Sequence, residues 1–247
     1  MKHAYLILAH GSYALLQRLV SAIDDERNDI FIHIDRKQKE LPRLQVRHSQ
    51  LFLLDKERVY VFWGDVSVVA AEFALMASAY KQGEYAYYHL LSGVDLPLKS
   101  QNDIHDFFET HQGKEFIGFY DGADLSVSLV RKVQRYHLFA QDFRGSGLEF
   151  LAKRIARALA IRAQELLGIK RHTNVRFAKG TQWWSLTGAL IESLLGKQDE
   201  ILSLYKHTFC ADEIAIQTYV YNSPFMAQVF APEDEAKSSL RHIGWRD

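Results

Sequence analysis

The first 35 residues contain two short, strand-like runs, the first of them continuously apolar, with an amphipathic segment between them. The first run, residues 4–9, stops at His10-Gly11-Ser12, and the second occupies residues 29–35. Between the runs, leucine, valine and isoleucine recur at helical spacing from Leu15 to Ile23. Wholly apolar runs of this length are typical of buried strands in a parallel sheet. The pattern predicts a right-handed β-α-β unit, which places both strand ends at one ligand-binding edge.

The rest of the chain continues this alternation of strands and helices. We expect helices over residues 67–81, 103–111, 148–168 and 188–195, and strands over residues 84–91 and 115–120. With 247 residues, 48% of them apolar, the chain suits one large α/β domain with a sizeable core. No internal repeat is visible.

Composition and motifs exclude several classes of protein. Lysine plus arginine and aspartate plus glutamate number 30 each, so no overall positive charge attracts nucleic acid. The chain lacks a Gly-x-Gly-x-x-Gly turn, a Gly-Lys-Ser/Thr phosphate loop and a Gly-x-Ser-x-Gly elbow, which argues against dehydrogenases, P-loop enzymes and serine hydrolases. The lone Cys210 and the scattered histidines offer no zinc-ligand spacing. With no signal peptide and no long apolar segment, we expect a cytoplasmic protein.

Two segments combine residue types that suit chemistry. Asp212 and Glu213 stand together before the apolar run 214–216, where they are either the acidic first turn of a helix or a catalytic carboxylate with a structural neighbour. Residues 179–187 place Trp183 and Trp184 beside glycine, threonine and glutamine. Because indole rings stack on sugar C–H faces, this segment is either a sugar-binding wall or core.

The predicted helix 148–168 is long, basic and amphipathic. Its cations are Lys153, Arg154, Arg157 and Arg162, and Lys170 and Arg171 follow directly. One interpretation is a helix packed on the core with a solvated basic side. The other is peripheral docking onto an anionic membrane through residues 148–171, which would place a cytoplasmic protein at the inner face of the membrane. Nucleic-acid binding through residues 131–171 is disfavoured by the neutral net charge and by the scarcity of aromatic residues on the basic helix, where Phe150 is the only one.

Five motifs, in order, resemble the core-2/I-branching enzyme family over nearly the full length of the chain. They are residues 4–10 with 32–37, the Val61-Phe62-Trp63-Gly64 turn, residues 87–99, residues 179–184, and Ala211-Asp212-Glu213. Members of the family are β-1,6-N-acetylglucosaminyltransferases and the related peptide O-xylosyltransferases. The resemblance implies a GT-A-type (Rossmann-like) α/β fold, with a mixed, mostly parallel sheet flanked by helices.

The resemblance also implies a reaction and a division of the chain. One domain, residues 1–247, would have a nucleotide-sugar half (1–112) and an acceptor and catalytic half (113–247). It would transfer a sugar, first of all GlcNAc, from a UDP-sugar to a hydroxyl of a glycan or lipid-linked acceptor, with inversion to a β linkage. The alternatives are a xylosyl- or hexosyltransferase of the same fold and a catalytically impaired member that only binds carbohydrate or nucleotide.

The same resemblance assigns roles to individual residues. Glu213 would be the general base, and Asp212 would cap the helix or orient a neighbour. The nucleotide-sugar pocket would be lined by Ala9, His10, Asp35, Arg36, Lys37 and Tyr60, with Arg241 at the diphosphate. The acceptor side would be lined by Arg135, Trp183 and Trp184.

No metal is expected as a cofactor. The best-studied branch of the family lacks the metal-binding Asp-x-Asp motif, and Asp95 likewise stands alone in Gly-Val-Asp-Leu-Pro. A metal-dependent hexosyltransferase that uses Asp95 is the alternative. Family members usually continue past the Ile-x-Trp segment and carry a second diphosphate-binding cation there. We therefore expect a shortened form, impaired activity, or a substitute cation such as Lys179 or Arg246.

Overall fold

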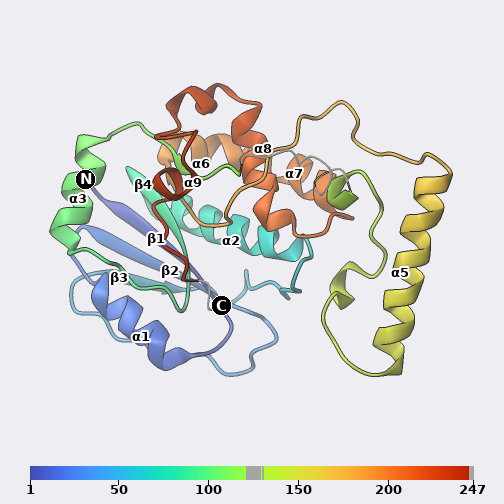
Figure 1. Cartoon of the computed structure of the whole chain (residues 1–247). Coiled ribbons are helices and arrows are strands. Elements are labelled where there is room, and N and C mark those ends of the chain that lie inside the picture. Colours follow the sequence, from blue (N-terminus) through green and yellow to red (C-terminus); the bar gives the residue numbers. More distant parts are fainter. Residues whose placement is uncertain (121–128, 130, 245–247) are drawn as a thin grey trace.

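The computed structural model describes residues 1–120, 129 and 131–244, and a six-stranded sheet forms its centre (Figure 1). The strand order is β3-β2-β1-β4-β6-β5. Strands β1, β2, β3 and β4 pair in parallel, and β6 pairs antiparallel with both β4 and β5. The predicted α/β class with a mixed, mostly parallel sheet is therefore confirmed. The strands are β1 His3–Ala9, β2 Asn28–Ile34, β3 Gln50–Leu53, β4 Tyr87–Ser92, β5 Phe116–Ile117 and β6 Trp184–Thr187.

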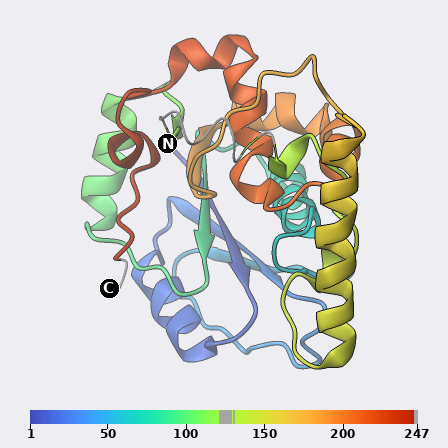
Figure 2. The ribbon, with the colours of Figure 1, turned by 45° about the vertical axis from the view of Figure 1, so that its right-hand side comes forward.

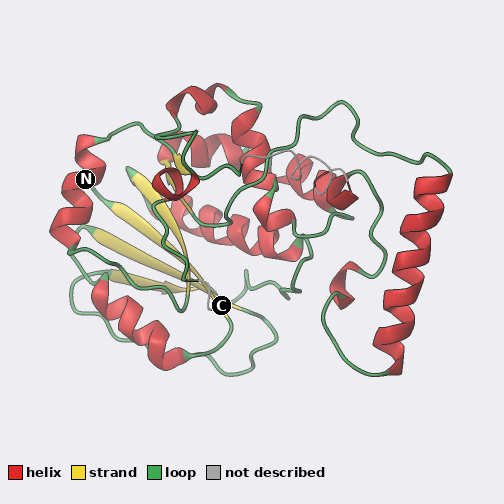
Figure 3. Cartoon of the chain, viewed as in Figure 1, coloured by secondary structure: helices red, strands yellow, loops and turns green. Residues whose placement is uncertain are grey.

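Helices cover both faces of this sheet (Figure 3). On β1, Tyr5 and Ile7 pack in the same cluster as α1, whereas Ala4 and Leu6 pack with α2, as the alternation of side chains along a strand requires. The helices are α1 Tyr13–Ala22, α2 Ser67–Gln82, α3 Gln101–Thr110, α5 Leu148–Leu166, α6 Gly188–Leu195, α7 Gln198–Tyr205, α8 Ala215–Tyr221 and α9 Glu235–Ser239. The described part of the chain also forms three short 3-10 turns, η1 Ala140–Asp142, η2 Ala211–Glu213 and η3 Pro224–Gln228.

Most predicted elements appear within a few residues of their expected bounds. Helix α3 begins at a capping box, in which the Ser100 side chain accepts from the Asp103 amide and the Asp103 carboxylate accepts from the Ser100 amide. The structure differs at residues 211–213, which form a 3-10 turn rather than the first turn of a regular helix. It also adds α7 and the strand β6, which is too short to show an alternating pattern.

A buried polar chain joins the middle of the sheet. His89 on β4 contacts Ser185 on β6 through Nδ1 at 2.8 Å and His3 on β1 through Nε2 at 3.1 Å. Burial is the largest cause that lowers the pKa of both rings, to about 3 for His3 and well below the usual value for His89. Both histidines are therefore neutral at physiological pH, and each ring can donate and accept hydrogen bonds.

Helix α5 stands at one side of the molecule (Figures 1 and 2). The predicted helix is confirmed, but the interpretation that packs its apolar side on the core is wrong. Only Ile161 and Gln164 of this helix are buried, and its leucines point to solvent. Among the helices of the described ranges, none has the length and apolar character to cross a membrane.

Gly180 lies where two chain segments approach each other closely. A Cβ at this position would lie 1.8 Å from the carbonyl oxygen of Gly118, which is backbone and cannot move aside cheaply. We expect Gly180→Ala to lower the free energy of unfolding by roughly 1–3 kcal/mol or more, as overpacking does. Chemical denaturation measures the effect.

Gly11→Ala serves as the matched control, since a Cβ at Gly11 meets nothing within 4 Å. Equal stability of the two variants would contradict the close approach.

Candidate active site

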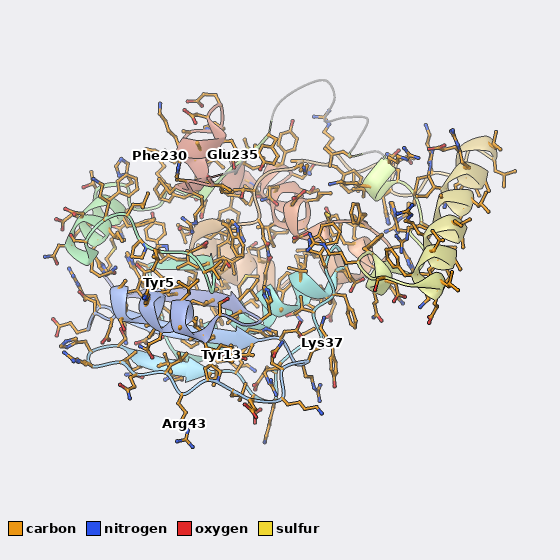
Figure 4. The ribbon with its side chains drawn as sticks, turned by 60° about the horizontal axis from the view of Figure 1, so that its bottom comes forward. Tyr5, Tyr13, Lys37, Arg43, Phe230 and Glu235 are labelled. Atoms are coloured by element: carbon orange, nitrogen blue, oxygen red, sulfur yellow. The ribbon has the colours of Figure 1, made fainter. Side chains whose placement is uncertain are left out.

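The carboxyl ends of β1 and β2 meet, as predicted, around a fixed carboxylate. The amide of Asp35 donates to the carbonyl of Ala9 at 3.0 Å. The buried Asp35 side chain accepts from the amide of Lys37 at 3.0 Å and lies 3.3 Å from its Nζ. Figure 4 labels Lys37 at the end of the sheet that faces the side of α5. His10 is exposed beside this group.

An exposed aromatic ring with a cation over it completes this edge. The amide of Val59 donates to Nε2 of His33 at 2.8 Å, and burial lowers the pKa of His33 to about 4, so the neutral ring accepts this bond. The Arg36 amide donates to the Val59 carbonyl, and its guanidinium lies 5.2 Å from the ring centroid of the exposed Tyr60. Such a platform suits a flat, anionic ligand such as a nucleotide. The structure thus brings the predicted donor residues together, apart from Arg241.

The loop after β4 closes on β1. The Gly93 amide donates to the carbonyl of Leu8 at 2.9 Å, and a Cβ on Gly93 would lie 2.7 Å from that of Ala9. Asp95 is committed to this turn, because its carboxylate accepts from the Ser92 amide at 2.9 Å. Burial raises the pKa of Asp95. Within the described residues, no cluster of three or more histidine, cysteine or acidic side chains could hold a metal ion.

Glu213 ends the 3-10 turn η2, which two main-chain hydrogen bonds hold. The Cys210 amide donates to the carbonyl of Gly64 at 2.8 Å, and the Gly180 amide donates to the carbonyl of Glu213 at 3.0 Å. Both Gly64 and Cys210 have positive φ, at 77° and 53°. Three of the predicted motifs, the Trp63-Gly64 turn, residues 179–184 and residues 211–213, therefore converge on one carboxylate.

Two lysines flank that carboxylate. Nζ of Lys179 lies 3.1 Å and Nζ of Lys132 lies 3.5 Å from Oε2 of Glu213, whose side chain is 35% exposed. Each ammonium also rests on an aromatic ring, Lys179 at 5.1 Å from the Tyr120 centroid and Lys132 at 5.4 Å from the Phe209 centroid. The site therefore holds a solvent-accessible carboxylate between two fixed cations.

Asp212 does not cap a helix. The residue before α8 is Ile214, which makes no side-chain cap, and Asp212 is instead partly buried, with its Oδ1 atom shielded from solvent. Burial, followed by the neighbouring charge of Glu213, raises the pKa of Asp212 to about 6. Close by, the fully buried Glu72 of α2 accepts from Nε2 of Gln182 at 2.8 Å. Burial raises the pKa of Glu72 well above its usual value, which favours the protonated form of this side chain.

The paired tryptophans differ in their surroundings. Trp184 is the first residue of β6 and has no exposed surface, because it packs in the main core cluster. Its predicted place on the acceptor side is therefore wrong. Trp183 lines a cavity of about 980 Å³ between the loop after β4, α3 and residues 240–244. The alternation of side chains along an extended segment explains the split.

Arg135 is also a structural residue in this chain. Its side chain is buried and donates through Nη1 to the carbonyl of Ile169, just beyond α5. This bond joins the segment before η1 to the end of α5 and leaves little of the guanidinium for an acceptor. The predicted acceptor-binding role of Arg135 has no support in this geometry.

Arg241 joins the C-terminal segment to the sheet. Its Nη1 donates to the carbonyls of Ser239 and Leu240, and its Nη2 donates to the carbonyls of Leu90 and Trp184 and to Oγ of Ser185. Its guanidinium lines the same cavity as Trp183 and Asp95. Burial lowers the pKa of Arg241 to about 10, so it stays charged at neutral pH. Arg241 therefore offers positive charge, but not a free two-pronged fork, to a ligand. The other candidate cation, Arg246, lies outside the described residues.

Sequence reasoning missed Lys132 and Glu72. Glu72 stood at an inward position of the apolar helix 67–81, where a carboxyl group is unusual, and that was the available signal. Lys132 gave no comparable signal, since it is one of several basic residues in its segment. The sequence suggested Lys179 only as a substitute cation for the diphosphate and gave no sign of its contact with Glu213.

The two buried acids predict how stability depends on pH. A carboxyl group whose pKa is raised on folding binds its proton more tightly in the folded state, so stability is full at low pH and falls as pH rises. For Asp212 this loss begins near its usual pKa of 3.8 and is complete near 6, and for Glu72 it begins near 4.5 and continues to a higher pH. We expect Glu72→Gln to flatten the decline of Tm between about pH 5 and pH 8.

Thermal unfolding followed by circular dichroism over this pH range measures the slope. Glu233→Gln, which changes an exposed residue, should retain the wild-type slope. Parallel curves for Glu72→Gln and the wild type would contradict a raised pKa at Glu72.

Comparison with known proteins assigns the sequence to a protein family. The sequence model described as "Branch: Core-2/I-Branching enzyme" matches residues 3–247. Xylosyltransferase 2 from Rattus norvegicus is 22% identical over 252 aligned residues, which cover 98% of this chain and 26% of that protein. Xylosyltransferase 2 from Homo sapiens has the same identity and coverage. Xylosyltransferase 1 from Rattus norvegicus is 21% identical, over 90% of this chain and 26% of that protein.

The chain thus spans about a quarter of the length of these curated relatives. Among solved structures, mouse xyloside xylosyltransferase 1 in its apo form aligns over 91% of this chain and 83% of that chain, with 9% identity and a TM-score of 0.34. A similarity at that level carries no weight for fold or function.

Proposed function

The chain belongs to the core-2/I-branching enzyme family, and we propose that it is an inverting glycosyltransferase with a UDP-sugar as donor. Its acceptor would be a hydroxyl group of a glycan or of a lipid-linked sugar, and the product a β-glycoside. One observation carries the proposal. Gly64, Gly180 and η2, which belong to three separate motifs, meet through main-chain hydrogen bonds and hold the Glu213 carboxylate at a solvent-accessible position.

The reaction is a single in-line displacement. Glu213 takes the proton of the acceptor hydroxyl, the hydroxyl oxygen bonds to the anomeric carbon, and the bond from that carbon to the UDP oxygen breaks with its electron pair on UDP. Both lysine contacts are made to Oε2 of Glu213, so we assign Oε1 to the acceptor proton. Base catalysis of this kind typically contributes about 10²–10⁴ in rate.

The donor would lie along the carboxyl edge of β1 and β2. The base and ribose would lie against the Tyr60 ring and the Asp35 carboxylate, and Arg36 and Lys37 would offer charge to the phosphates. Positive charge at a departing diphosphate stabilises the transition state more than the ground state. Arg241 would contribute through its charge alone, because its Nη groups already bond to main-chain carbonyls.

The donor sugar is proposed in two forms. GlcNAc follows from the resemblance to the N-acetylglucosaminyltransferase branch of the family. Xylose is the second candidate, because the curated relatives reported above are xylosyltransferases. The two sugars differ by the N-acetyl group and the hydroxymethyl group, so a direct comparison of binding separates them.

Substitution of Glu213 tests the base. We expect Glu213→Gln to lower kcat by about 10²–10⁴ and to leave the Kd for UDP nearly unchanged, since the amide cannot accept the proton but keeps the side-chain shape. Turnover with a soluble glycan acceptor and calorimetry with UDP provide the two readouts.

Glu233→Gln is the control for loss of a negative charge at an exposed position and should behave as the wild type. Near wild-type turnover in Glu213→Gln would remove Glu213 from the proposed mechanism.

Thermal shift with UDP-GlcNAc, UDP-xylose, UDP-glucose and UDP-galactose tests the donor, with and without EDTA. A donor present at about 100 times its Kd should add about 2.7 kcal/mol of stability. We expect the true donor to give the largest shift, UDP-GlcNAc first, and EDTA to leave that shift and the turnover intact. Loss of turnover in EDTA that added divalent metal restores would contradict the metal-free proposal, and no shift with any UDP-sugar would contradict the donor class.

A further inference from the structure

Helix α5 presents an aliphatic arc to solvent, with the exposed Arg162 set between Leu159 and Leu166. Five of its aliphatic side chains share one side of the helix at spacings of three, four, four and seven residues, and they are between 43% and 87% exposed. Figures 1 and 2 show the helix at the side of the molecule in both views. The exposed residues Leu167 and Ile169 extend the arc just past the helix end. The five residues are Leu148, Leu151, Ile155, Leu159 and Leu166, and we call them the leucine arc.

The opposite side of α5 is fixed to the protein. Gln164 accepts from the Tyr136 amide at 2.7 Å and donates to the Tyr136 carbonyl at 3.0 Å. Arg157 donates to the carbonyls of Leu138, Phe139 and Asp142 at 2.9–3.1 Å. These bonds set the rotation of the helix, so the leucine arc faces outward because the polar side is already bonded.

The region around the arc carries a concentrated positive charge. Residues 131–176 contain eleven lysines and arginines and only three acids, although the whole chain has 30 of each charge. All three acids already pair with cations of the same region. Asp142 and Glu149 pair with Lys153, and Glu165 pairs with Arg131 and Arg162. Arg154 and Lys170 are exposed beside the leucine arc.

We propose that α5 is an in-plane docking helix for an anionic lipid bilayer. Its 19 residues span about 28 Å, and the arc would enter the acyl boundary while the flanking cations meet anionic headgroups. The aliphatic arc matches the acyl chains of such a bilayer, and the cationic border matches its anionic headgroups. A nucleic acid would neutralise the charge but leave the leucines in water.

Docking through α5 would also orient the candidate active site relative to the bilayer. This consequence, unlike the docking itself, rests on the proposed function. The loop before α5 contacts the motif turns directly. The Arg144 guanidinium lies 3.8 Å from the Trp63 ring centroid, and the rings of Phe143 and Phe209 are 4.4 Å apart. Phe209 leads into η2 and Glu213. A docked α5 would hold this catalytic turn near the bilayer, where an acceptor sugar on a lipid would be found.

Vesicle binding by the full chain tests the proposal without any measurement of activity. The probes are vesicles of phosphatidylcholine alone and of equimolar phosphatidylcholine and phosphatidylglycerol, analysed by co-sedimentation at low and high salt. We expect binding to the anionic vesicles and weaker binding in high salt, because salt screens the headgroup attraction. Absence of binding to anionic vesicles would overturn the proposal and leave the proposed transferase activity untouched.

Variants distinguish binding through the leucine arc from nonspecific adsorption of the protein to vesicles. Leu151→Gln combined with Leu159→Gln removes two exposed leucines, and we expect binding to fall by about tenfold or more with an unchanged Tm. Leu15→Gln, at an exposed leucine of α1, is the matched control and should bind as the wild type.

Equal binding by the double variant and the wild type would overturn the role of the arc. Light scattering tests the remaining alternative, in which the arc joins two copies of this chain. A wild-type dimer that the double variant converts to a monomer, without vesicle binding, would make the arc an interface between copies of this chain and overturn the lipid proposal.

Discussion

The hydrogen bond from the Gly180 amide to the Glu213 carbonyl is the contact on which the candidate site depends. It forms only because Gly180 lacks a side chain, since a Cβ would overlap the carbonyl of Gly118. The same segment then continues into β6, which joins the parallel strands to β5. One glycine thus connects the antiparallel end of the sheet to the turn that carries the carboxylate.

Several ionisable groups of this protein lie in its interior. Glu72 and the histidines on β1 and β4 are buried, Asp212 is partly buried, and burial disfavours the charged form of each. Glu213 and its two lysines stand apart from this interior at partly exposed positions. The result is an adjacent pair of acids in two environments, in which Asp212 faces the core and Glu213 faces solvent. This difference in exposure supports the proposal that Asp212 is a structural carboxylate and Glu213 the chemical one.

Local pattern was sufficient where a segment makes its contacts with near neighbours in the chain. Hydrophobic pattern predicted the strands β1 and β2 and the helices α1 and α2. A strand buried on both faces of a sheet needs a run of mainly apolar residues, and a helix buried along one stripe needs apolar residues at helical spacing. The sequence pattern did not predict the burial of Trp184 and Arg135, whose residue types suit a sugar-binding site. Their burial follows from which face of β6 meets α2 and from where α5 ends, and neither is visible locally.

By itself the sequence determined the class of fold, and it predicted a ligand edge at Ala9 and Asp35 and a catalytic role for Glu213, since each rests on a run of residues or on motifs in a fixed order. Only the tertiary structure decided which members of those motifs face solvent. It put Trp183 at a cavity and Trp184 in the core, tied Arg241 to main-chain carbonyls, and turned the leucines of α5 outward. The reason is that exposure depends on partners distant in the chain, and the same amphipathic helix can turn its apolar side inward or outward according to what its polar side has bound.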